Sequence, residues 1–471
     1  MSSFFSEIGW IPESAELVPL GELLEIIIDH RGKTPKKLGG DWIDEGIPAI
    51  SAKNVHNGVL TNRDDIRYVS KSIYKKWMKE DVKRGDIFLA SEGATMGEYL
   101  YWDFDFPVVL SQRLFCLRAD NIRLNSKYLY AFIRSENFQK QLSGRSTGTS
   151  VLGVRQSTLL EILVPIIDYK SQEFIGNTIY QLEKRIELNR QMNQTLEAMA
   201  QALFKSWFVN FDPVMDNALA AGAEIPADLQ AMAEKRRVIV SGAKQSHRLI
   251  DTNPELAAKF PSSFVFNEML GRWIPDGWEV SIFGEEFNIT MGQSPPGISY
   301  NENGVGKPFF QGKTDFGFRF PTNRIYCTDP KREAKKNDTL ISVRAPVGNA
   351  NLANSDCVIG RGLSAVRHKS NSISYTYYSV MALREVFDVF EGEGTVFGSI
   401  NQSSLKNIQV IKPSKSTMEI FDQFVSKWDN KIELNSGQIE SLTELRDRLL
   451  PELISGKVRA GEGLKVEYGN G

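Results

Sequence analysis

Two sets of basic and amide side chains, one in each half of the sequence, have the chemistry to bind nucleic acid. In the first half they are Arg31, Lys33, Lys36, Lys37, Lys53, Asn54, Arg145 and Arg155. In the second half they are Gln293, Gln311, Lys313, Arg344 and Arg361. Arginine, asparagine and glutamine suit the base edges of the major groove, and lysine suits phosphates. Charged loops are more often plain solvated surface, so each set alone favours DNA contact only weakly.

Enzyme motifs are missing from the sequence. Gly32-Lys33-Thr34 resembles the end of a phosphate-binding loop, but the earlier glycine of that motif is absent. Asn253-Pro254 is not followed by the proline and aromatic residue that adenine methyltransferases use. The four histidines and three cysteines are scattered and match no zinc-binding or disulfide pattern. The sequence therefore predicts no catalytic residue and no metal site.

The overall composition is that of a folded, water-soluble protein. Of 471 residues, 41% are hydrophobic and 24% are charged, and the formal net charge is −2. No apolar run is long enough to cross a membrane, and the first residues do not form a secretory signal. We therefore expect a cytoplasmic protein with no membrane partner. A protein of this near-neutral charge must concentrate its positive charge locally if it binds DNA.

A duplicated segment is the strongest organising feature of the chain. Trp10-Ile11-Pro12 recurs as Trp273-Ile274-Pro275, and Ile186-Glu187-Leu188-Asn189 recurs as Ile432-Glu433-Leu434-Asn435. Further matches lie between these, and the spacing between matching residues only decreases along the chain, as deletions in a second copy would produce. Within each copy, short β-branched and aromatic runs alternate with turn residues, and a helix is expected over 126–142. The predicted fold class is α+β, with two pseudo-repeated mixed α/β domains.

Each copy ends in a long helix with an apolar seam. The seam residues recur at helical spacing and are Ile179, Leu182, Ile186, Asn189 and Leu196 in the first copy, and Val425, Trp428, Ile432, Asn435 and Leu442 in the second. Such sustained heptads predict a coiled coil, in which each helix is the natural partner of the other. Helices of this length span about 50 Å. Asn189 and Asn435 occupy equivalent seam positions, where they either hydrogen-bond across the pair or tilt out to solvent.

These patterns divide the chain into six segments. They are a domain at 1–170, a helix with an aromatic extension at 171–214, a linker at 215–268, a second domain at 269–414, a second helix at 415–455 and a polar tail at 456–471. The linker is expected to return the chain from the first helix to the second domain. The tail is expected to be mobile.

The aromatic extension of the first helix carries a stripe of large side chains. Its members fall on one helical face and are Phe204, Trp207, Phe208 and Phe211. An aromatic stripe of this size needs cover, which predicts the docking of another subunit. The alternative, equally supported by the residues, is packing onto the chain's own domain or second helix.

The sequence resembles a known family at four places. These are the Trp-Ile-Pro start of each copy, the close of the first domain at 148–157, the segment 202–213, and the ending at 449–456. Together they are similar to specificity subunits of type I restriction–modification systems. The resemblance covers nearly the whole chain, and the order of domain, helix, domain and helix also matches.

The resemblance implies a function and a set of partners. Each domain would be a target-recognition domain that reads one half of an asymmetric, bipartite double-stranded DNA site from the major groove. The two helices would pack antiparallel as a coiled coil that separates the domains. Two methyltransferase subunits and two motor–nuclease subunits would bind the chain and use S-adenosylmethionine, ATP and magnesium. The chain itself would hold no cofactor and no catalytic residue, and it would bind DNA tightly only in the assembled complex.

Two other interpretations remain open from the residues themselves. A stand-alone nuclease or methyltransferase would need the motifs that are missing. A coiled-coil adaptor that binds proteins but no DNA fits the helices and the composition almost as well. The resemblance is what favours DNA recognition over the adaptor.

Overall fold

The computed structural model describes the whole chain except residues 1–2, 149–150, 243–248, 393–397 and 459–471. The tail expected to be mobile lies almost entirely outside the described residues. The chain divides into two compact units: unit 1 is Met1–Gln191 with Asn435–Gly471, and unit 2 is Met192–Leu434. Each unit therefore contains one domain and part of both long helices. The two copies in the sequence each consist of one domain and the whole helix that follows it. The compact units therefore differ from the sequence copies in how they share the helices.

A four-stranded antiparallel sheet forms the centre of unit 1. Its strands, in spatial order, are β10 (Tyr99–Tyr101), β9 (Ile87–Ala90), β12 (Leu114–Ala119) and β4 (Leu24–Asp29). Both faces of this sheet are buried, which explains why β12 is apolar almost throughout. Phe115 and Leu117 face one cluster, and Leu114 and Cys116 face another, as the alternation of side chains along a strand requires.

Helices cover one face of this sheet and a smaller sheet covers the other. The small sheet consists of β11 (Val109–Leu110), β5 (Ile47–Ile50) and β8 (Arg67–Val69), with α1 (Lys71–Trp77) beside it. The single helix expected over 126–142 is two helices, α2 (Ser126–Arg134) and α3 (Glu136–Gly144). Ser135 has extended backbone angles and its side chain accepts a hydrogen bond from the Phe138 N–H, so it caps a new helix.

Unit 2 repeats the central sheet of unit 1 strand for strand, whereas its smaller sheet has five strands in place of three. Its central sheet has the order β23 (Ala350–Leu352), β22 (Thr339–Ser342), β25 (Leu363–His368) and β17 (Phe287–Met291). β24 (Cys357–Ile359) pairs parallel with β19 (Lys307–Phe310), as β11 pairs parallel with β5. The helix pair α2 and α3 has its counterpart in α11 (Ile373–Ala382) and α12 (Arg384–Gly392). The duplication inferred from short sequence matches is thus a duplication of the central sheet and of the helix pair that covers it.

The ends of each domain are closed by paired strands. In unit 1 these are the hairpin β1 (Ser3–Ser6) and β2 (Gly9–Pro12), and β3 (Glu16–Pro19) paired with β13 (Leu163–Ile166). In unit 2 they are the hairpin β14 (Phe264–Asn267) and β15 (Arg272–Pro275), and β16 (Glu279–Ile282) paired with β26 (Gln409–Lys412). The short helices α4 (Gln156–Leu160) and α13 (Gln402–Lys406) precede β13 and β26.

Most of the segment 215–268, expected to be a linker, folds into a small helical cluster, and its end forms β14 of the unit 2 domain. It contains most of α6 (Asp212–Ala220), α7 (Gln230–Gly242), α8 (Leu249–Thr252) and α9 (Pro254–Ala257). Met215, Ala218 and Ala233 form a core of their own. The Asn217 side chain donates to the backbone oxygens of Ala257 and Phe260, which ties α6 to the end of α9.

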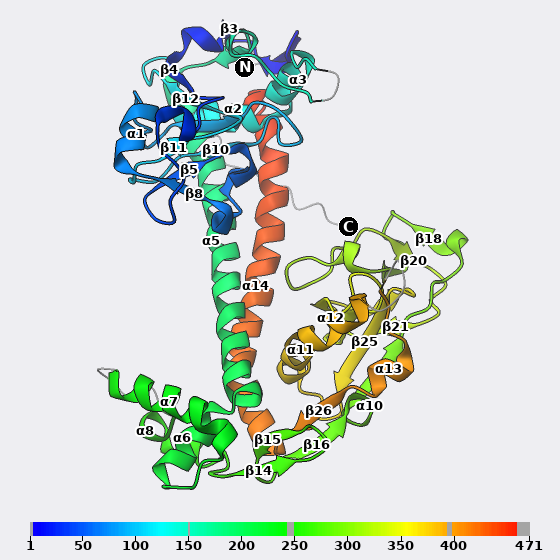
Figure 1. Ribbon diagram of the computed structural model, residues 1–471. Helices are drawn as coiled ribbons and strands as arrows, with labels where there is room; N and C mark the ends of the chain where they lie inside the picture. Colours follow the sequence, from blue (N-terminus) through cyan, green and yellow to red (C-terminus); the bar gives the residue numbers. More distant parts are fainter. Residues whose placement is uncertain (1–2, 149–150, 243–248, 393–397, 459–471) are drawn as a thin grey trace. The chain divides into compact units, whose positions relative to one another are not determined.

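Two long helices contribute to both units. They are α5 (Tyr169–Phe204), continued by a π turn at Lys205–Val209, and α14 (Lys415–Ile454). Within unit 1 they lie side by side and antiparallel (Figure 1). Glu183 contacts Arg446 and Asn189 contacts Gln438, so the residue numbers rise along α5 as they fall along α14. None of the helices in the described ranges combines the length and apolarity needed to cross a bilayer.

The seam residues predicted from the heptads are covered by protein. Ile179, Ile186, Asn189, Val425, Ile432 and Asn435 are buried, and Leu182, Leu196, Trp428 and Leu442 are half-buried. The alternative in which Asn189 and Asn435 tilt into solvent is therefore wrong. The Asn189 amide donates to the Gln438 side chain at 3.2 Å, so this seam position is held by a polar contact between the helices.

Candidate nucleic-acid interface

An open cavity in unit 2 brings together residues from three strand ends. Its volume is about 590 Å³, and it is lined by Ser294, Gln311, Gly312, Lys313, Thr314, Arg344, Ala345, Pro346, Arg361 and Gly362. Four of the five residues predicted in the second half of the sequence meet here. The fifth, Gln293, is exposed and adjacent to Ser294, and its backbone N–H donates to Ile359 O at 3.0 Å.

Three strands of unit 2 place these side chains, because each strand ends beside the cavity. Gln311 follows β19, Arg344 follows β22 and Arg361 follows β24. Phe310 is buried at the end of β19, so the next residue emerges at the cavity. A Cβ on Gly362 would approach the Gln311 backbone oxygen to 2.2 Å. Glycine is needed there because the two chain segments pass so closely.

The cavity is cationic. Lys313, Arg344 and Arg361 are exposed, and none of them forms an ion pair with another residue in the described part of the chain. Arg361 is oriented by a weak contact between its Nε and the Ser294 Oγ at 3.4 Å. No acidic side chain lines the cavity. Such a site suits a ligand that presents hydrogen-bond acceptors or negative charge.

Unit 1 has the same backbone at this place, as matching hydrogen bonds show. Ser111 N–H donates to Ile50 O at 2.7 Å, and its counterpart Gly360 N–H donates to Phe310 O at 2.8 Å. Likewise Ser91 N–H donates to Arg113 O, and Val343 N–H donates to Gly362 O. The two domains can therefore be compared residue by residue around the cavity.

The side chains at these equivalent places differ between the units. Glu92 forms an isolated bridge with Gly153, and Arg344 forms the same bridge with Ser399. The place of Arg344 is thus taken in unit 1 by Glu92, which pairs with Arg113 at 3.1 Å. The matched hydrogen bonds make three further residues of unit 1 equivalent to cavity residues of unit 2. Gln112 is equivalent to Arg361, Ser51 to Gln311, and Lys53 to Lys313. Lysine alone is retained among the cavity cations.

Most basic side chains of the loop at 31–37 in unit 1 form ion pairs or hydrogen bonds with other residues of the chain. Arg31 pairs with Asp29 at 2.7 Å and stacks on the Phe115 ring. Lys33 Nζ donates to Trp77 O at 2.8 Å, and partial burial and the charge of Lys79 lower its pKa. Lys37 donates to Gly32 O. Lys36 is exposed.

The remaining predicted residues of unit 1 have different environments. Lys53 is exposed and contacts Asp65 at 3.4 Å. Asn54 is only 1% exposed and completes a capping box with Ser51, so it is a structural residue, and its prediction as a DNA contact is wrong. Arg145 donates to two backbone oxygens, and Arg155 is exposed just before α4.

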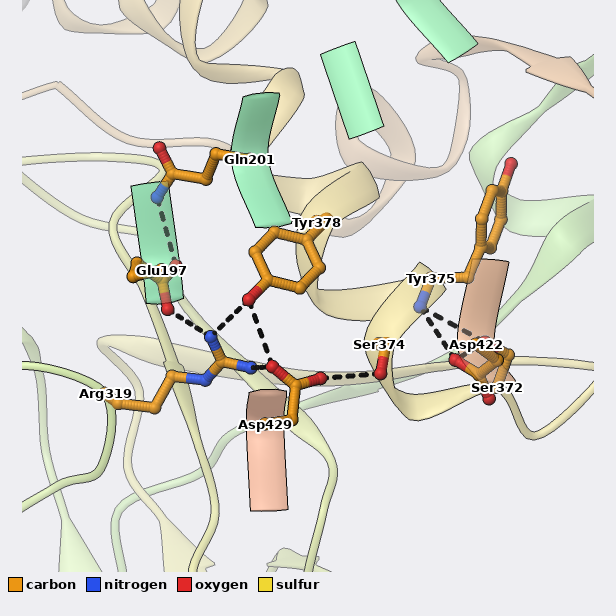
Figure 2. A network of polar contacts seen from close by, with 9 residues as sticks. All are labelled: Glu197, Gln201, Arg319, Ser372, Ser374, Tyr375, Tyr378, Asp422 and Asp429. Atoms are coloured by element: carbon orange, nitrogen blue, oxygen red, sulfur yellow. Dashed lines mark hydrogen bonds and ion pairs between the residues drawn. The ribbon is translucent and has the colours of Figure 1, made fainter. Parts of the chain in front are cut away.

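A buried charge network in unit 2 was not predicted from the sequence (Figure 2). Arg319, which is 1% exposed, pairs with Glu197 of α5 and with Asp429 of α14, the latter at 2.6 Å. The Tyr378 hydroxyl accepts from Arg319 at 2.8 Å, and Ser374 Oγ donates to Asp429. One arginine therefore ties the domain of unit 2 to both helices. Nothing in the local sequence around Arg319 signals this role.

Unit 1 uses a comparable network built from other residues. Arg134, at the end of α2, pairs with Glu183 of α5 at 3.0 Å and with Asp447 of α14 at 2.9 Å. Arg446 also pairs with Glu183. Each domain is thus held on both long helices by a mostly buried arginine and two acids.

The aromatic stripe proposed as a docking surface is buried inside unit 2. Phe204, Trp207, Phe208 and Phe211 are between 3% and 7% exposed. They pack with the chain's own aromatic side chains, among them Phe260, Trp278, Tyr375 and Phe421. The prediction of subunit docking by these side chains is therefore wrong, and the alternative of packing within the chain holds.

Among the described residues, no group of three or more histidine, cysteine or acidic side chains is arranged to hold a metal ion. The three cysteines are all buried and free. The cationic cavity of unit 2, in contrast, brings exposed basic and amide side chains together and is a candidate site for ligand binding.

Comparison with known proteins gives a consistent result. The family profile described as "Type I restriction modification DNA specificity domain" matches twice, at residues 12–198 and 275–444. A putative type I restriction enzyme MjaX specificity subunit of Methanocaldococcus jannaschii is 25% identical, with 96% of each chain covered. The type I restriction enzyme HindI specificity subunit of Haemophilus influenzae is 27% identical, with 81% of this chain and 88% of that protein covered.

A solved structure supports the fold. The crystal structure of the type I restriction–modification system S subunit from M. genitalium aligns with a TM-score of 0.57 at 16% sequence identity. The alignment covers 93% of this chain and 96% of that chain. At this identity the likeness concerns the architecture alone.

Proposed function

Because the chain belongs to the family of type I restriction–modification DNA specificity subunits, we propose that it reads a bipartite, asymmetric DNA site, one half-site per domain. The observation that carries this proposal is the internal comparison of the two units. They share one backbone around the cavity edge, whereas the polar side chains at equivalent places differ. Two readers with one fold and different side chains suit two half-sites of different sequence.

The chain acts as the recognition and scaffolding subunit and takes no part in the chemistry. Its sequence contains no catalytic motif, and S-adenosylmethionine, ATP and magnesium would be bound by partner subunits. The isolated chain is expected to bind DNA weakly because its net charge is −2. Partners that supply phosphate contacts would make the assembled complex bind tightly.

We propose two methyltransferase subunits and two motor–nuclease subunits as partners. The duplication supports partners that bind in pairs, because both units expose a leucine at the same position of the repeat. Leu188 in unit 1 and Leu434 in unit 2 occupy equivalent positions on α5 and α14 and are 57% and 55% exposed. A large apolar side chain exposed at the same place in both copies suits one partner bound twice.

The first prediction concerns the half-sites. Cells that carry the chain with its methyltransferase should show adenine methylation at a motif with two defined halves and a fixed gap. Replacing residues 1–170 with the corresponding domain of a relative should change one half of the motif and leave the other intact. Sequencing of methylated positions across the genome measures this directly.

Two outcomes of that experiment contradict the proposal. A change in both halves would show that the domains do not read independently. The absence of any motif, together with no DNA shift by the chain plus methyltransferase in a gel, would favour the adaptor interpretation.

The second prediction concerns the partners. Leu188→Asp and Leu434→Asp should each remove one methyltransferase from the complex, because a carboxylate buried in an apolar contact costs several kcal/mol. Native mass spectrometry should count two methyltransferases with the wild-type chain, one with each single variant and none with the double variant. Unchanged thermal melting of the isolated chain is the control for folding. Two copies bound to the double variant would contradict the proposed surface.

A further inference from the structure

The duplication allows base-reading residues to be separated from phosphate-binding residues within a single sequence. The sugar–phosphate backbone is chemically the same in both half-sites, so residues that contact it need not differ between the units. Residues that read bases must differ when the half-sites differ. The matched hydrogen bonds of the two units fix which residues are equivalent.

Lysine is the cavity residue that both units retain. Lys53 follows the end of β5 by the same number of residues as Lys313 follows the end of β19. The two strands are equivalent, because β5 pairs in parallel with β11 as β19 does with β24. Both lysines are exposed. A compact, flexible ammonium group is well suited to phosphate and carries little base information.

Arginine is the cavity residue that the units do not share. The place of Arg344 is occupied in unit 1 by Glu92, as the bridges to Ser399 and Gly153 establish. The place of Arg361 is occupied by Gln112. At Arg344 the charge is reversed, which rules out a common phosphate contact at that position, since glutamate repels phosphate.

We propose that Arg344 and Arg361 read a guanine in the half-site bound by unit 2, while Lys313 contacts the DNA backbone beside it. This inference rests on the proposed function and names the base class that the unit 2 cavity takes. The planar guanidinium group donates two parallel hydrogen bonds to the O6 and N7 acceptors that guanine presents in the major groove.

The geometry of the cavity fits such a contact. Arg344 and Arg361 line one cavity without an acidic residue, so their donors are not consumed by neighbouring carboxylates. The Ser294 hydroxyl makes a weak contact with Arg361 Nε at 3.4 Å, at the same edge of the cavity. Gln311 at the same edge offers an amide for a neighbouring adenine or for a bridging water.

The test uses the chain assembled with its methyltransferase and a DNA library randomised over the unit 2 half-site. That half-site is the one left unchanged when residues 1–170 are replaced. The variants are R344E and R361Q, which introduce the unit 1 residues, R344A, and K313A as the matched cation control. Methylated library members are sequenced to obtain the preference at each position.

The expected results separate the two kinds of contact. The wild-type half-site should contain a guanine, and R344E, R344A and R361Q should each lower the preference for it by about 5- to 150-fold. The other half-site should stay unchanged. K313A should weaken methylation of all sequences alike and reduce the dependence of binding on salt.

Three outcomes would overturn the inference. They are a unit 2 half-site without guanine, an arginine variant that weakens all sequences alike, and a K313A variant that alters the motif. Each of these leaves a bipartite motif in place and therefore leaves the proposed function standing. A wild-type complex that methylates without any bipartite motif would overturn the proposed function itself, and the inference with it.

Discussion

Replacing Arg319 with methionine is expected to lower the free energy of unfolding of unit 2 by about 3–5 kcal/mol. The substitution preserves much of the side-chain volume but leaves Glu197 and Asp429 without their cation. Both acids are nearly buried, with side chains about a tenth exposed, so water cannot replace the lost pairing. Urea unfolding followed by circular dichroism would measure the loss.

The matched control for this experiment is Arg237→Met. Arg237 is exposed and pairs with Glu234 one helical turn away, and such a pair contributes about 0–1 kcal/mol. Both variants remove one arginine from unit 2, so they differ mainly in burial. Equal stability of the two variants would contradict the view that the Arg319 network holds the domain on the helices.

Replacing Phe208 with alanine is the second change expected to have a large effect. Its ring packs against Trp278, Tyr375 and Phe421 at centroid distances of 6.0, 5.3 and 5.3 Å. Deleting a buried phenylalanine from such a cluster costs about 3–5 kcal/mol. Phe424→Ala, at a position 43% exposed, should cost less than half as much. Differential scanning calorimetry of both variants provides the comparison.

The Phe208 variant also separates core packing from subunit docking. A docking residue would leave the stability of the isolated chain unchanged and weaken methyltransferase binding. A core residue would lower the melting temperature and leave binding unchanged at temperatures below the transition. We expect the second pattern, because the side chain is 7% exposed.

The sequence predicted those features whose signal is local or repeated. Trp10-Ile11-Pro12 and its second copy revealed the duplication, and the structure shows the same strand order in the central sheets of both units. The seam positions follow from the period of an α-helix alone. Residues such as Ile186 and Ile432 could therefore be assigned before any fold was known.

Features that depend on distant contacts could not be predicted. Nothing near Arg319 in the sequence indicates that Glu197 and Asp429, from two different helices, converge on it. The packing of each domain on parts of both helices is equally non-local. The cavity could be predicted in part. The residue types at 311, 344 and 361 indicated DNA contact, but only the fold shows that these residues lie together at the strand ends.

Some errors at the candidate site had signals that were readable in the sequence. Ser51 and Asn54 have the spacing of a capping pair, which points to a structural asparagine. Asp29 stands two residues before Arg31 and pairs with it. Ser135 within the expected helix 126–142 is a favoured N-cap residue, which explains why two helices form there.

The network around Arg134 sets a rule for grafting recognition domains between relatives. Glu183, Arg446 and Asp447 belong to the long helices and remain when residues 1–170 are exchanged, whereas Arg134 leaves with the domain. An incoming domain must bring a cation to the same place, or it leaves Glu183 short of a partner. We therefore expect the compatibility of a donor domain to depend on the side chains that it packs against the long helices. Donor domains with different loops should therefore be accepted when they keep a cation that pairs with Glu183 and Asp447.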